Sequence, residues 1–368
     1  MKYWLIAVLL ISCNNKSPVQ VEKPAARITV AKERSAIKLD FKKGISSIFE
    51  DSNGNFWFGS IEEGLCKYNG VSATYFTQAE GLPSNAAGRI QEDTDGNIWV
   101  STGKGISYYD GKSFTTIPVN KEWSGNAQSA PTSIPSTGEW SLNQESLWFP
   151  IYNDGILRYD QEQMDYLATP IPKTDFSYHQ DRADRSYHHP YSVITIYQDN
   201  NGKLWLGTFN RGVVGYDGQT FEYHNPNNFG VGTIRSIYQD KDGAHWFGSN
   251  GGGLYQFADG KYTNFTKDNG LTSSNPGYDE FGTLSRVWAI SQDNEGNMWF
   301  GTIDAGLWSF DGKELTNYSM KDGLPSNSVE TIYKDKAGKL WFCTGTSSKG
   351  ILYTLNGGSF EIINPIVE

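Results

Sequence analysis

Residues 168–191 hold the chain's densest group of side chains that could bind or react with another molecule. Three of the chain's five histidines fall here among tyrosines, arginines and aspartates. The candidate ligand contacts are Tyr178, His179, Arg182, Arg185, Tyr187, His188 and His189. Imidazole and carboxylate groups suit zinc or copper, but this spacing matches no metal motif, so no metal and no cofactor is assigned. Two interpretations stay open: a loop that contacts a ligand by stacking and hydrogen bonding, and a packed surface loop.

A second group of candidates follows the tryptophan-containing segments of the chain. It comprises Tyr152, Asp154, Phe209, Asn210, Arg211 and Asp304, joined by Arg286, which lies just before an expected strand. Aromatic rings beside paired polar groups fit a sugar-like ligand, and they fit many other small molecules as well. No nucleophile and no acid–base pair stands out, so no catalytic residue is predicted and an enzyme is the less favoured interpretation.

A repeated segment determines where these candidates lie. The pattern Ile-x-x-Asp-x-x-Gly-x-x-Trp recurs at seven tryptophans, with a degenerate third copy: Trp57, Trp99, Trp148, Trp205, Trp246, Trp299 and Trp341. Successive tryptophans are 42, 49, 57, 41, 53 and 42 residues apart. Four short strands fit in a unit of about 42 residues, which is the size of a propeller blade. Residues 41–368 are therefore predicted to form an all-β, seven-bladed β-propeller with four antiparallel strands per blade and the repeat tryptophans in its core.

The Asp-x-x-Gly turns and the long insertions are expected on opposite faces of the propeller. In each turn the glycine would take a positive φ and the aspartate would accept backbone N–H groups. Asp93-Thr94-Asp95-Gly96-Asn97 resembles part of a calcium loop but lacks the downstream glutamate, which favours a hairpin turn. The enlarged intervals, residues 119–139, 168–191 and 268–285, all fall between blades. They share a face with the loops between second and third strands, and this is the predicted binding face.

Composition supports this fold and narrows the choice of partners. The 368 residues include 40 Gly, and aromatic residues make up 14% of the chain. That mixture is typical of β-structure with many tight turns and unlike that of a disordered chain. The net charge is −10 and no lysine or arginine cluster forms a footprint, which argues against nucleic acid as a partner.

The N-terminus predicts a lipid-anchored protein. Residues 1–12, MKYWLIAVLLIS, place a basic residue before a short apolar run, and with Cys13 they resemble the lipobox of bacterial lipoproteins. We expect a signal peptide over residues 1–12, lipid on Cys13 and a polar tether over residues 13–40. The predicted location is the bacterial cell envelope, at the outer membrane, on its periplasmic or surface-exposed side. The lipid is the only expected contact with the membrane.

Two structural alternatives stay open in the sequence. Residues 36–41 align with fourth strands of other repeats, so either they or residues 360–363 form the outer edge of the last blade. Cys66 and Cys343 lie in the first and last repeats, either as a disulfide bridge or as two small buried thiols.

The repeat resembles the two-component-regulator propeller repeat of bacterial extracellular sensor domains. The resemblance rests on Ile-x-x-Asp-x-x-Gly-Asn-x-Trp-x-Gly-Thr followed by Gly-Leu-x-x-Tyr-Asp-Gly, and it covers residues 44–363. It implies a non-enzymatic, ligand-binding sensor propeller whose partner is a small molecule, a glycan, or an envelope or signalling protein. Family sensors usually continue into a second propeller, a β-sandwich, a membrane span and a histidine kinase. A propeller standing alone would therefore report through another protein.

The alternative is a propeller enzyme. Streptogramin lyases are seven-bladed propellers with similar short repeats, and a resemblance to them implies a metal and a histidine near the channel. The histidines of residues 168–191 are those expected to reach that position, whereas His245, beside Trp246, is expected to be structural. A protein-interaction platform in an outer-membrane assembly is a third interpretation, which the residues do not separate from the first.

Overall fold

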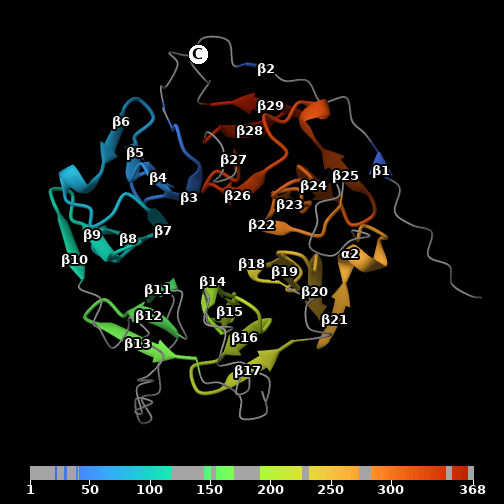
Figure 1. Ribbon diagram of the computed structural model, residues 1–368, viewed down its shortest axis with the longest axis horizontal. Coiled ribbons are helices and arrows are strands. Elements are labelled where there is room, and N and C mark those ends of the chain that lie inside the picture. Colours follow the sequence, from blue (N-terminus) through green and yellow to red (C-terminus); the bar gives the residue numbers. More distant parts are fainter. Residues whose placement is uncertain are drawn as a thin grey trace, which may run out of the picture.

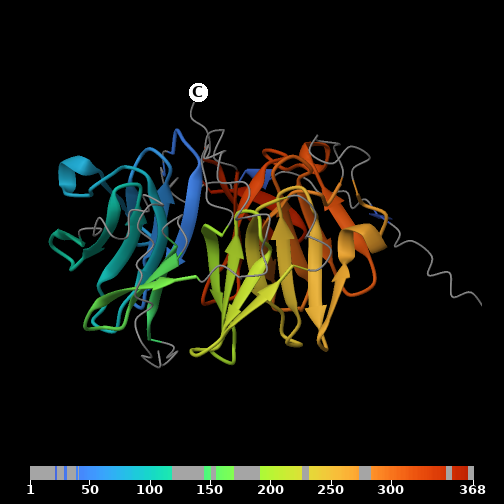
Figure 2. The same ribbon diagram turned by 60° about the horizontal axis from the view of Figure 1, so that its bottom comes forward.

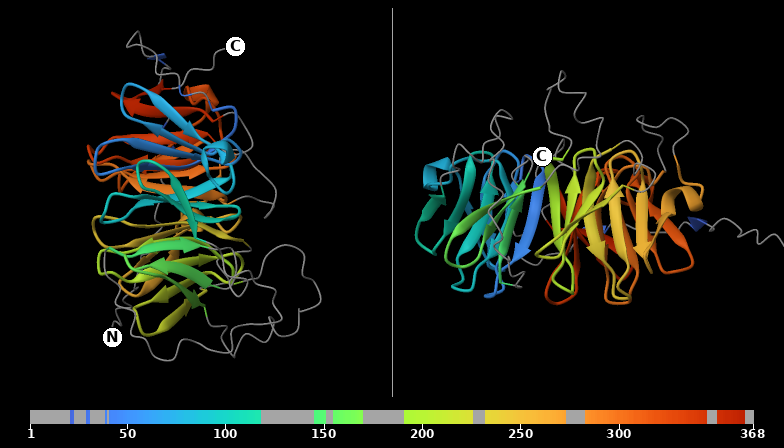
Figure 3. Two further views of the ribbon diagram at one scale, coloured as in Figure 1. Left: turned by 90° about the vertical axis from the view of Figure 1, so that its left-hand side faces the viewer. Right: turned by 90° about the horizontal axis from the view of Figure 1, so that it is seen from below.

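Seven β-sheets form a ring around a central axis, and each sheet radiates outward as one blade (Figure 1). This computed structural model describes residues 21–22, 29–30, 39, 41–117, 145–150, 155–169, 191–225, 232–272, 283–344 and 350–363. Seen from the side, the turns gather at the two faces of the ring (Figures 2 and 3). The predicted all-β, seven-bladed propeller is confirmed.

Six blades have four consecutive antiparallel strands, with the first strand nearest the axis and the fourth at the rim. Blades 1 and 2 contain β3 (Ile45–Glu50), β4 (Phe56–Ser60), β5 (Leu65–Tyr68), β6 (Ala73–Phe76), β7 (Ala87–Glu92), β8 (Ile98–Thr102), β9 (Gly105–Tyr109) and β10 (Phe114–Ile117). Blades 4 and 5 contain β14 (Val193–Gln198), β15 (Leu204–Thr208), β16 (Val213–Tyr216), β17 (Phe221–His224), β18 (Ile234–Gln239), β19 (His245–Ser249), β20 (Leu254–Ala258) and β21 (Lys261–Asn264). Blades 6 and 7 contain β22 (Val287–Gln292), β23 (Met298–Thr302), β24 (Leu307–Phe310), β25 (Leu315–Tyr318), β26 (Val329–Lys334), β27 (Leu340–Thr344), β28 (Leu352–Asn356) and β29 (Ser359–Ile362).

Blade 3 differs from the others. Its described residues form three strands, β11 (Leu147–Pro150), β12 (Gly155–Tyr159) and β13 (Met164–Ala168), which pair in that order. By alignment of Trp148 with the other repeat tryptophans, β11 is a second strand, and residues 118–144 before it lie outside the described part of the chain. The expectation of four strands per blade is therefore met in the six blades that are described throughout their sheets.

In six blades an aspartate holds the hairpin turn between the first and second strands, and it is buried in blades 1, 2, 4 and 5. In blade 1 the Oδ1 atom of Asp51 accepts the backbone N–H of Asn55 at 2.7 Å, while its Oδ2 accepts the indole N–H of Trp57 at 2.8 Å. The same indole–carboxylate bond, 2.7–2.9 Å long, recurs in blades 2, 4, 5, 6 and 7. The turn glycine takes the expected positive φ, 77° at Gly54. The residue six before Trp148 is Leu142, so the sequence of blade 3 does not supply this carboxylate.

The core lies between blades, and the repeat tryptophans fill it. Their exposed fractions run from 1% at Trp57 to 8% at Trp341. Trp57 of blade 1 packs with Ile98 and Val100 of blade 2, and Trp341 of blade 7 packs with Phe58 of blade 1. The prediction that these tryptophans are core residues is confirmed, and their burial joins each blade to the next.

The ring closes where blade 7 meets blade 1. The fourth strand of blade 7 is β29, and the short β2 (Thr29–Val30) pairs with it in parallel on the outside. A similar strand, β1 (Val21–Glu22), pairs in parallel with β25 of blade 6. Leu39 and Phe41 pack into the core cluster shared by the two blades. Cys66 and Cys343 lie in the same cluster as buried free thiols.

Hydrogen bonds show that the two sets of loops expected on the binding face do share it. The N–H of Phe209, after a second strand, donates to the carbonyl of Ser192, before a first strand, at 2.9 Å, and Gly306 donates likewise to Asn327 at 2.8 Å. The 310 helices η1 (Gln78–Glu80) and η3 (Met320–Asp322) and the helix α2 (Phe265–Asp268) begin three connections between blades. Most of the three insertions lies outside the described residues. Within the described residues, no helix is long and apolar enough to cross a membrane.

Candidate functional site

Blades 5 and 6 bring together five side chains on the face of the blade connections. Arg286, just before β22, donates from Nε to Oδ1 of Asn250 at 2.9 Å and from Nη1 to Oδ2 of Asp304 at 3.3 Å. Trp288 donates its indole N–H to the same Asn250 oxygen at 3.2 Å. The guanidinium of Arg235, on β18, lies over the Trp288 ring, 4.4 Å from its centroid. We call Arg235, Asn250, Arg286, Trp288 and Asp304 the mouth cluster.

The backbone fixes the geometry of the mouth cluster. Asn250 and Arg286 form an isolated antiparallel bridge, which joins the loop after β19 to the entry of β22. Asp304 follows β23 in the same blade as Arg286, and the side chains of this ion pair are 14% and 25% exposed. Both side chains are therefore partly buried but still reach the surface. The predicted residues Arg286 and Asp304 thus lie in direct contact.

The predicted residues Phe209, Asn210 and Arg211 form the loop between β15 and β16 of blade 4. The N–H of Arg211 donates to Oγ1 of Thr208 at 2.9 Å, and its guanidinium lies 6.0 Å from the centroid of the Tyr191 ring. Asn210 is exposed. This loop belongs to blade 4, so it contributes to the same face as the mouth cluster from a different blade.

The other predicted site residues lie outside the described part of the chain. They are Tyr152, Asp154, Tyr178, His179, Arg182, Arg185, Tyr187, His188 and His189, together with the expected lipidation site Cys13. Their interpretation as ligand contacts remains a prediction from the sequence.

The Asp93 turn and His245 have structural roles. Asp93 accepts the N–H of Asn97 at 2.8 Å and the Trp99 indole N–H at 2.7 Å, so its segment is the expected hairpin turn. His245 is buried against Trp205, and its Nε2 lies 3.2 Å from Oδ2 of Asp199. Burial lowers its pKa, although Asp199 opposes that shift. Within the described residues, no three His, Cys, Asp or Glu side chains are grouped as metal ligands.

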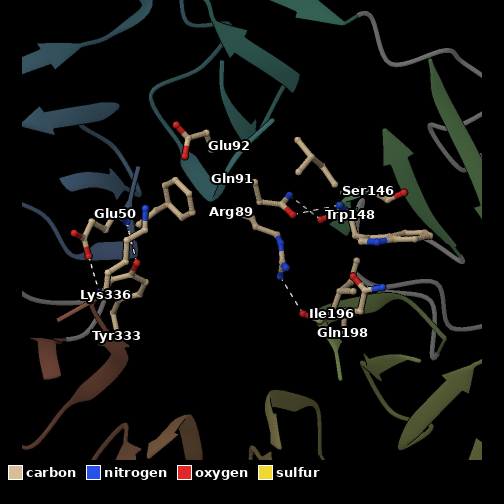
Figure 4. Close-up of a pocket in the computed structure, with 12 residues that line it drawn as sticks. Glu50, Arg89, Gln91, Glu92, Ser146, Trp148, Ile196, Gln198, Tyr333 and Lys336 are labelled. Atoms are coloured by element: carbon tan, nitrogen blue, oxygen red, sulfur yellow. Dashed lines mark hydrogen bonds between the residues drawn. The ribbon is translucent and has the colours of Figure 1, made fainter. Parts of the chain in front are cut away.

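A cavity that the sequence did not predict lies on the axis, toward the face of the Asp-x-x-Gly turns. Its volume is about 410 Å³, and we call it the axial cavity (Figure 4). It is lined by Phe49, Glu50, Arg89, Gln91, Glu92, Ser146, Leu147, Trp148, Ile196, Gln198, Tyr333 and Lys336. The lining residues come from blades 1, 2, 3, 4 and 7. In the sequence, the related feature is the degenerate third repeat around Trp148, which lines this cavity. The sequence alone does not show that this repeat borders a cavity.

The repeats of this chain match a known protein family. The sequence profile described as "Two component regulator propeller" matches residues 41–62, 81–104, 189–210, 228–251, 282–304 and 323–346. The chain belongs to the two component regulator propeller family. The six matches fall on the six four-stranded blades of this regulator propeller, and the blade without a match is blade 3. No curated protein matches the sequence.

Solved structures share the fold of this regulator propeller at low sequence identity. The extracellular domain of a putative one component system from B. thetaiotaomicron has a TM-score of 0.58 and 18% identity, covering 88% of this chain and 40% of that chain. The propeller therefore spans less than half the length of that relative. A streptogramin B lyase has a TM-score of 0.61 and 17% identity, covering 87% and 96%. A virginiamycin B lyase from Staphylococcus aureus with quinupristin has a TM-score of 0.57 and 15% identity, covering 86% and 97%.

Proposed function

We propose that this regulator propeller is a non-enzymatic, sensor-type protein that binds a small molecule or glycan on the face of its blade connections. The observation that carries the proposal is the mouth cluster, in which an aromatic ring, an amide and an ion pair meet beside the axis. Polar groups held at fixed positions around an aromatic ring are typical of sites that orient a sugar-like ligand. The family match and the similar extracellular domain of a putative one component system support a role in sensing.

The proposal places the propeller in the bacterial envelope. Residues 1–12 and Cys13 carry the signal peptide and lipid attachment pattern, and the tether would leave the propeller free to meet its ligand. A second envelope or signalling protein would then read the bound state. Labelling cells with radioactive palmitate, with Cys13→Ser as the control, tests the anchor, because only a lipidated cysteine incorporates the label.

Calorimetric screening of the purified protein against envelope and dietary oligosaccharides tests ligand binding. For any oligosaccharide that binds, Arg286→Met should weaken the affinity roughly tenfold or more, because it removes an anchoring arginine from the site. Lys313→Met is the matched control, since it removes one positive charge from an exposed turn of the same blade. Absence of heat with every oligosaccharide, or equal affinities in the two variants, would contradict the proposal. Thermal unfolding of both variants verifies that they fold.

The second candidate is a metal-dependent lyase, favoured by the whole-chain similarity to streptogramin B lyase. This activity would require the histidines of residues 168–191 to reach the face of the mouth cluster. Metal analysis of the purified protein, repeated after substitution of His188 and His189, separates the two candidates. Stoichiometric metal that is lost in the double variant supports the lyase, whereas metal-free protein that binds an oligosaccharide supports the sensor.

A further inference from the structure

The axial cavity borders blade 3 on the side that faces the axis. At blade 3, the strand nearest the axis among the described residues is β11, and its inner edge is met by a side chain. Gln91, on β7 of blade 2, donates from Nε2 to the carbonyl of Trp148 at 3.0 Å, and the N–H of Trp148 donates back to Oε1 of Gln91 at 3.3 Å. One amide thus forms the two hydrogen bonds that a neighbouring strand would form with Trp148. Gln91 and Trp148 both line the axial cavity, so this pair of hydrogen bonds forms part of its wall.

Arg89 crosses this gap from blade 2 to blade 4. Its Nη1 donates to the carbonyl of Ile196 at 2.9 Å, and Figure 4 shows the side chain extending across the opening between Gln91 and Ile196. Its Nε is buried without a hydrogen-bond partner, and no carboxylate of the described residues pairs with the guanidinium. Burial lowers the pKa of Arg89 to about 10, so the group stays charged at neutral pH. Arg89 is half-buried, and a cation with a buried, unused donor is costly unless something compensates it.

The acidic residues that line the axial cavity form hydrogen bonds with groups other than Arg89. Both carboxylate oxygens of Glu92 accept hydrogen bonds from Ser52, each at 2.7 Å. Glu50 accepts the backbone N–H of Lys336 at 2.7 Å, and Lys336 donates from Nζ to the carbonyl of Asp51 at the same distance. Figure 4 shows Glu50 and Lys336 together on the side of the cavity away from Arg89. The carboxylates therefore border the cavity as further hydrogen-bond acceptors, and among the described residues they leave Arg89 without a counterion.

We propose that the axial cavity binds a small hydroxylated carboxylate, whose carboxyl group pairs with Arg89 and whose hydroxyl groups bond to the surrounding acceptors. The planar guanidinium fork is suited to a carboxylate, since two N–H groups can donate to its two oxygens. The volume falls within the range of small-molecule sites. The lining of this site shares no residue with the mouth cluster, and apart from Arg89 its first-strand residues lie in the second halves of their strands. The proposal therefore does not depend on the function proposed above.

Calorimetry with sodium gluconate, sorbitol and sodium sulfate tests this site on the purified full chain. Gluconate should bind, and sorbitol, which has the hydroxyl groups but no carboxylate, should not. Arg89→Gln should weaken gluconate binding roughly 10- to 100-fold, because it removes a charge-assisted hydrogen bond. Lys112→Gln is the control, since it removes a positive charge from an exposed turn of the same blade.

Several outcomes would overturn the proposal. Absence of gluconate binding, equal binding of sorbitol, or undiminished affinity in Arg89→Gln each contradict it. Binding of sulfate without gluconate would assign the cavity to inorganic oxyanions and remove the hydroxylated ligand. If Arg89→Gln does not fold, Arg89→Lys replaces it, because lysine keeps the charge but loses the fork, and an affinity equal to that of the wild type then counts against the proposal. None of these results bears on oligosaccharide binding at the mouth cluster.

Discussion

At the scale of single residues, one aspartate carboxylate in most blades accepts both a backbone N–H of its turn and the indole N–H of the repeat tryptophan. Asp240 in blade 5 accepts the backbone N–H of Ala244 at 2.9 Å through Oδ1 and the indole N–H of Trp246 at 2.7 Å through Oδ2. The turn role was predictable, because an aspartate before a glycine commonly accepts N–H groups across a hairpin. The indole bond was not predicted, although the constant six-residue spacing from aspartate to tryptophan contained it. Periodicity shows that two residues recur together, but not that their side chains meet.

Asp240→Asn tests the indole bond. An amide in place of the carboxylate removes the negative charge that accepts the buried indole N–H. We expect the free energy of unfolding to fall by about 1–3 kcal/mol, as for other hydrogen bonds to a charged group. Urea denaturation followed by tryptophan fluorescence measures the change. Asp259→Asn is the matched control on an exposed turn of the same blade, and an equal loss in both variants would show that the indole bond contributes nothing particular.

At the scale of elements, the sequence predicted the blades and their faces but not the join at blade 3. Strand number and turn position follow from local patterns of apolar residues, aspartate and glycine, which a repeat makes reliable. The hydrogen bonds of Gln91 and Arg89 join β7 to residues 57 and 107 positions away, and no local pattern encodes such a contact. The mouth cluster was predicted in part: Arg286 and Asp304 were expected site residues, whereas Trp288, whose indole N–H donates to Asn250, was not.

Gln91→Met tests the two hydrogen bonds between the Gln91 amide and the backbone of Trp148 on β11. Methionine preserves the length of the side chain but can neither donate to nor accept from the Trp148 backbone. We expect amide hydrogen exchange at Trp148 to accelerate and the free energy of unfolding to fall by about 1–3 kcal/mol. Gln163→Met is the control, because Gln163 is exposed in the turn between β12 and β13. Unchanged exchange at Trp148 would mean that another group protects this edge.

At the scale of the whole molecule, the ring is closed by packing between blades 7 and 1. Phe41 contacts Phe58 and Tyr75 edge-to-face, with centroids 5.8 and 6.1 Å apart. Burial raises the pKa of Cys66 to about 12, and burial raises that of Cys343 as well. Both thiols are therefore poor nucleophiles while the junction is closed. The sequence left both the closing strand and the state of these cysteines open, because each depends on which distant segments meet.

Phe41→Ala tests the junction. Removal of a buried phenyl ring should lower the free energy of unfolding by about 3–5 kcal/mol, and should speed labelling of Cys66 and Cys343 by a thiol reagent at pH 8. Labelling is measured in a Cys13→Ser background, so that only these two thiols react. Val71→Ala is the control, since Val71 is 87% exposed. A lower free energy of unfolding without faster labelling would mean that the ring first opens between another pair of blades.

Arg89 and Gln91 connect blade 2 to blades 4 and 3, and these connections would transmit the effect of a bound ligand to the ring. Blades 2, 3 and 4 pack on one another through the buried Trp99 and Trp148, and Arg89 adds a direct hydrogen bond from blade 2 to blade 4. A ligand paired with Arg89 would contact several blades around the axis at once. Occupancy would then alter the stiffness of the entire ring, and hydrogen exchange should slow in blades that never touch the ligand. A propeller built this way can report binding at its surface without any blade changing its shape.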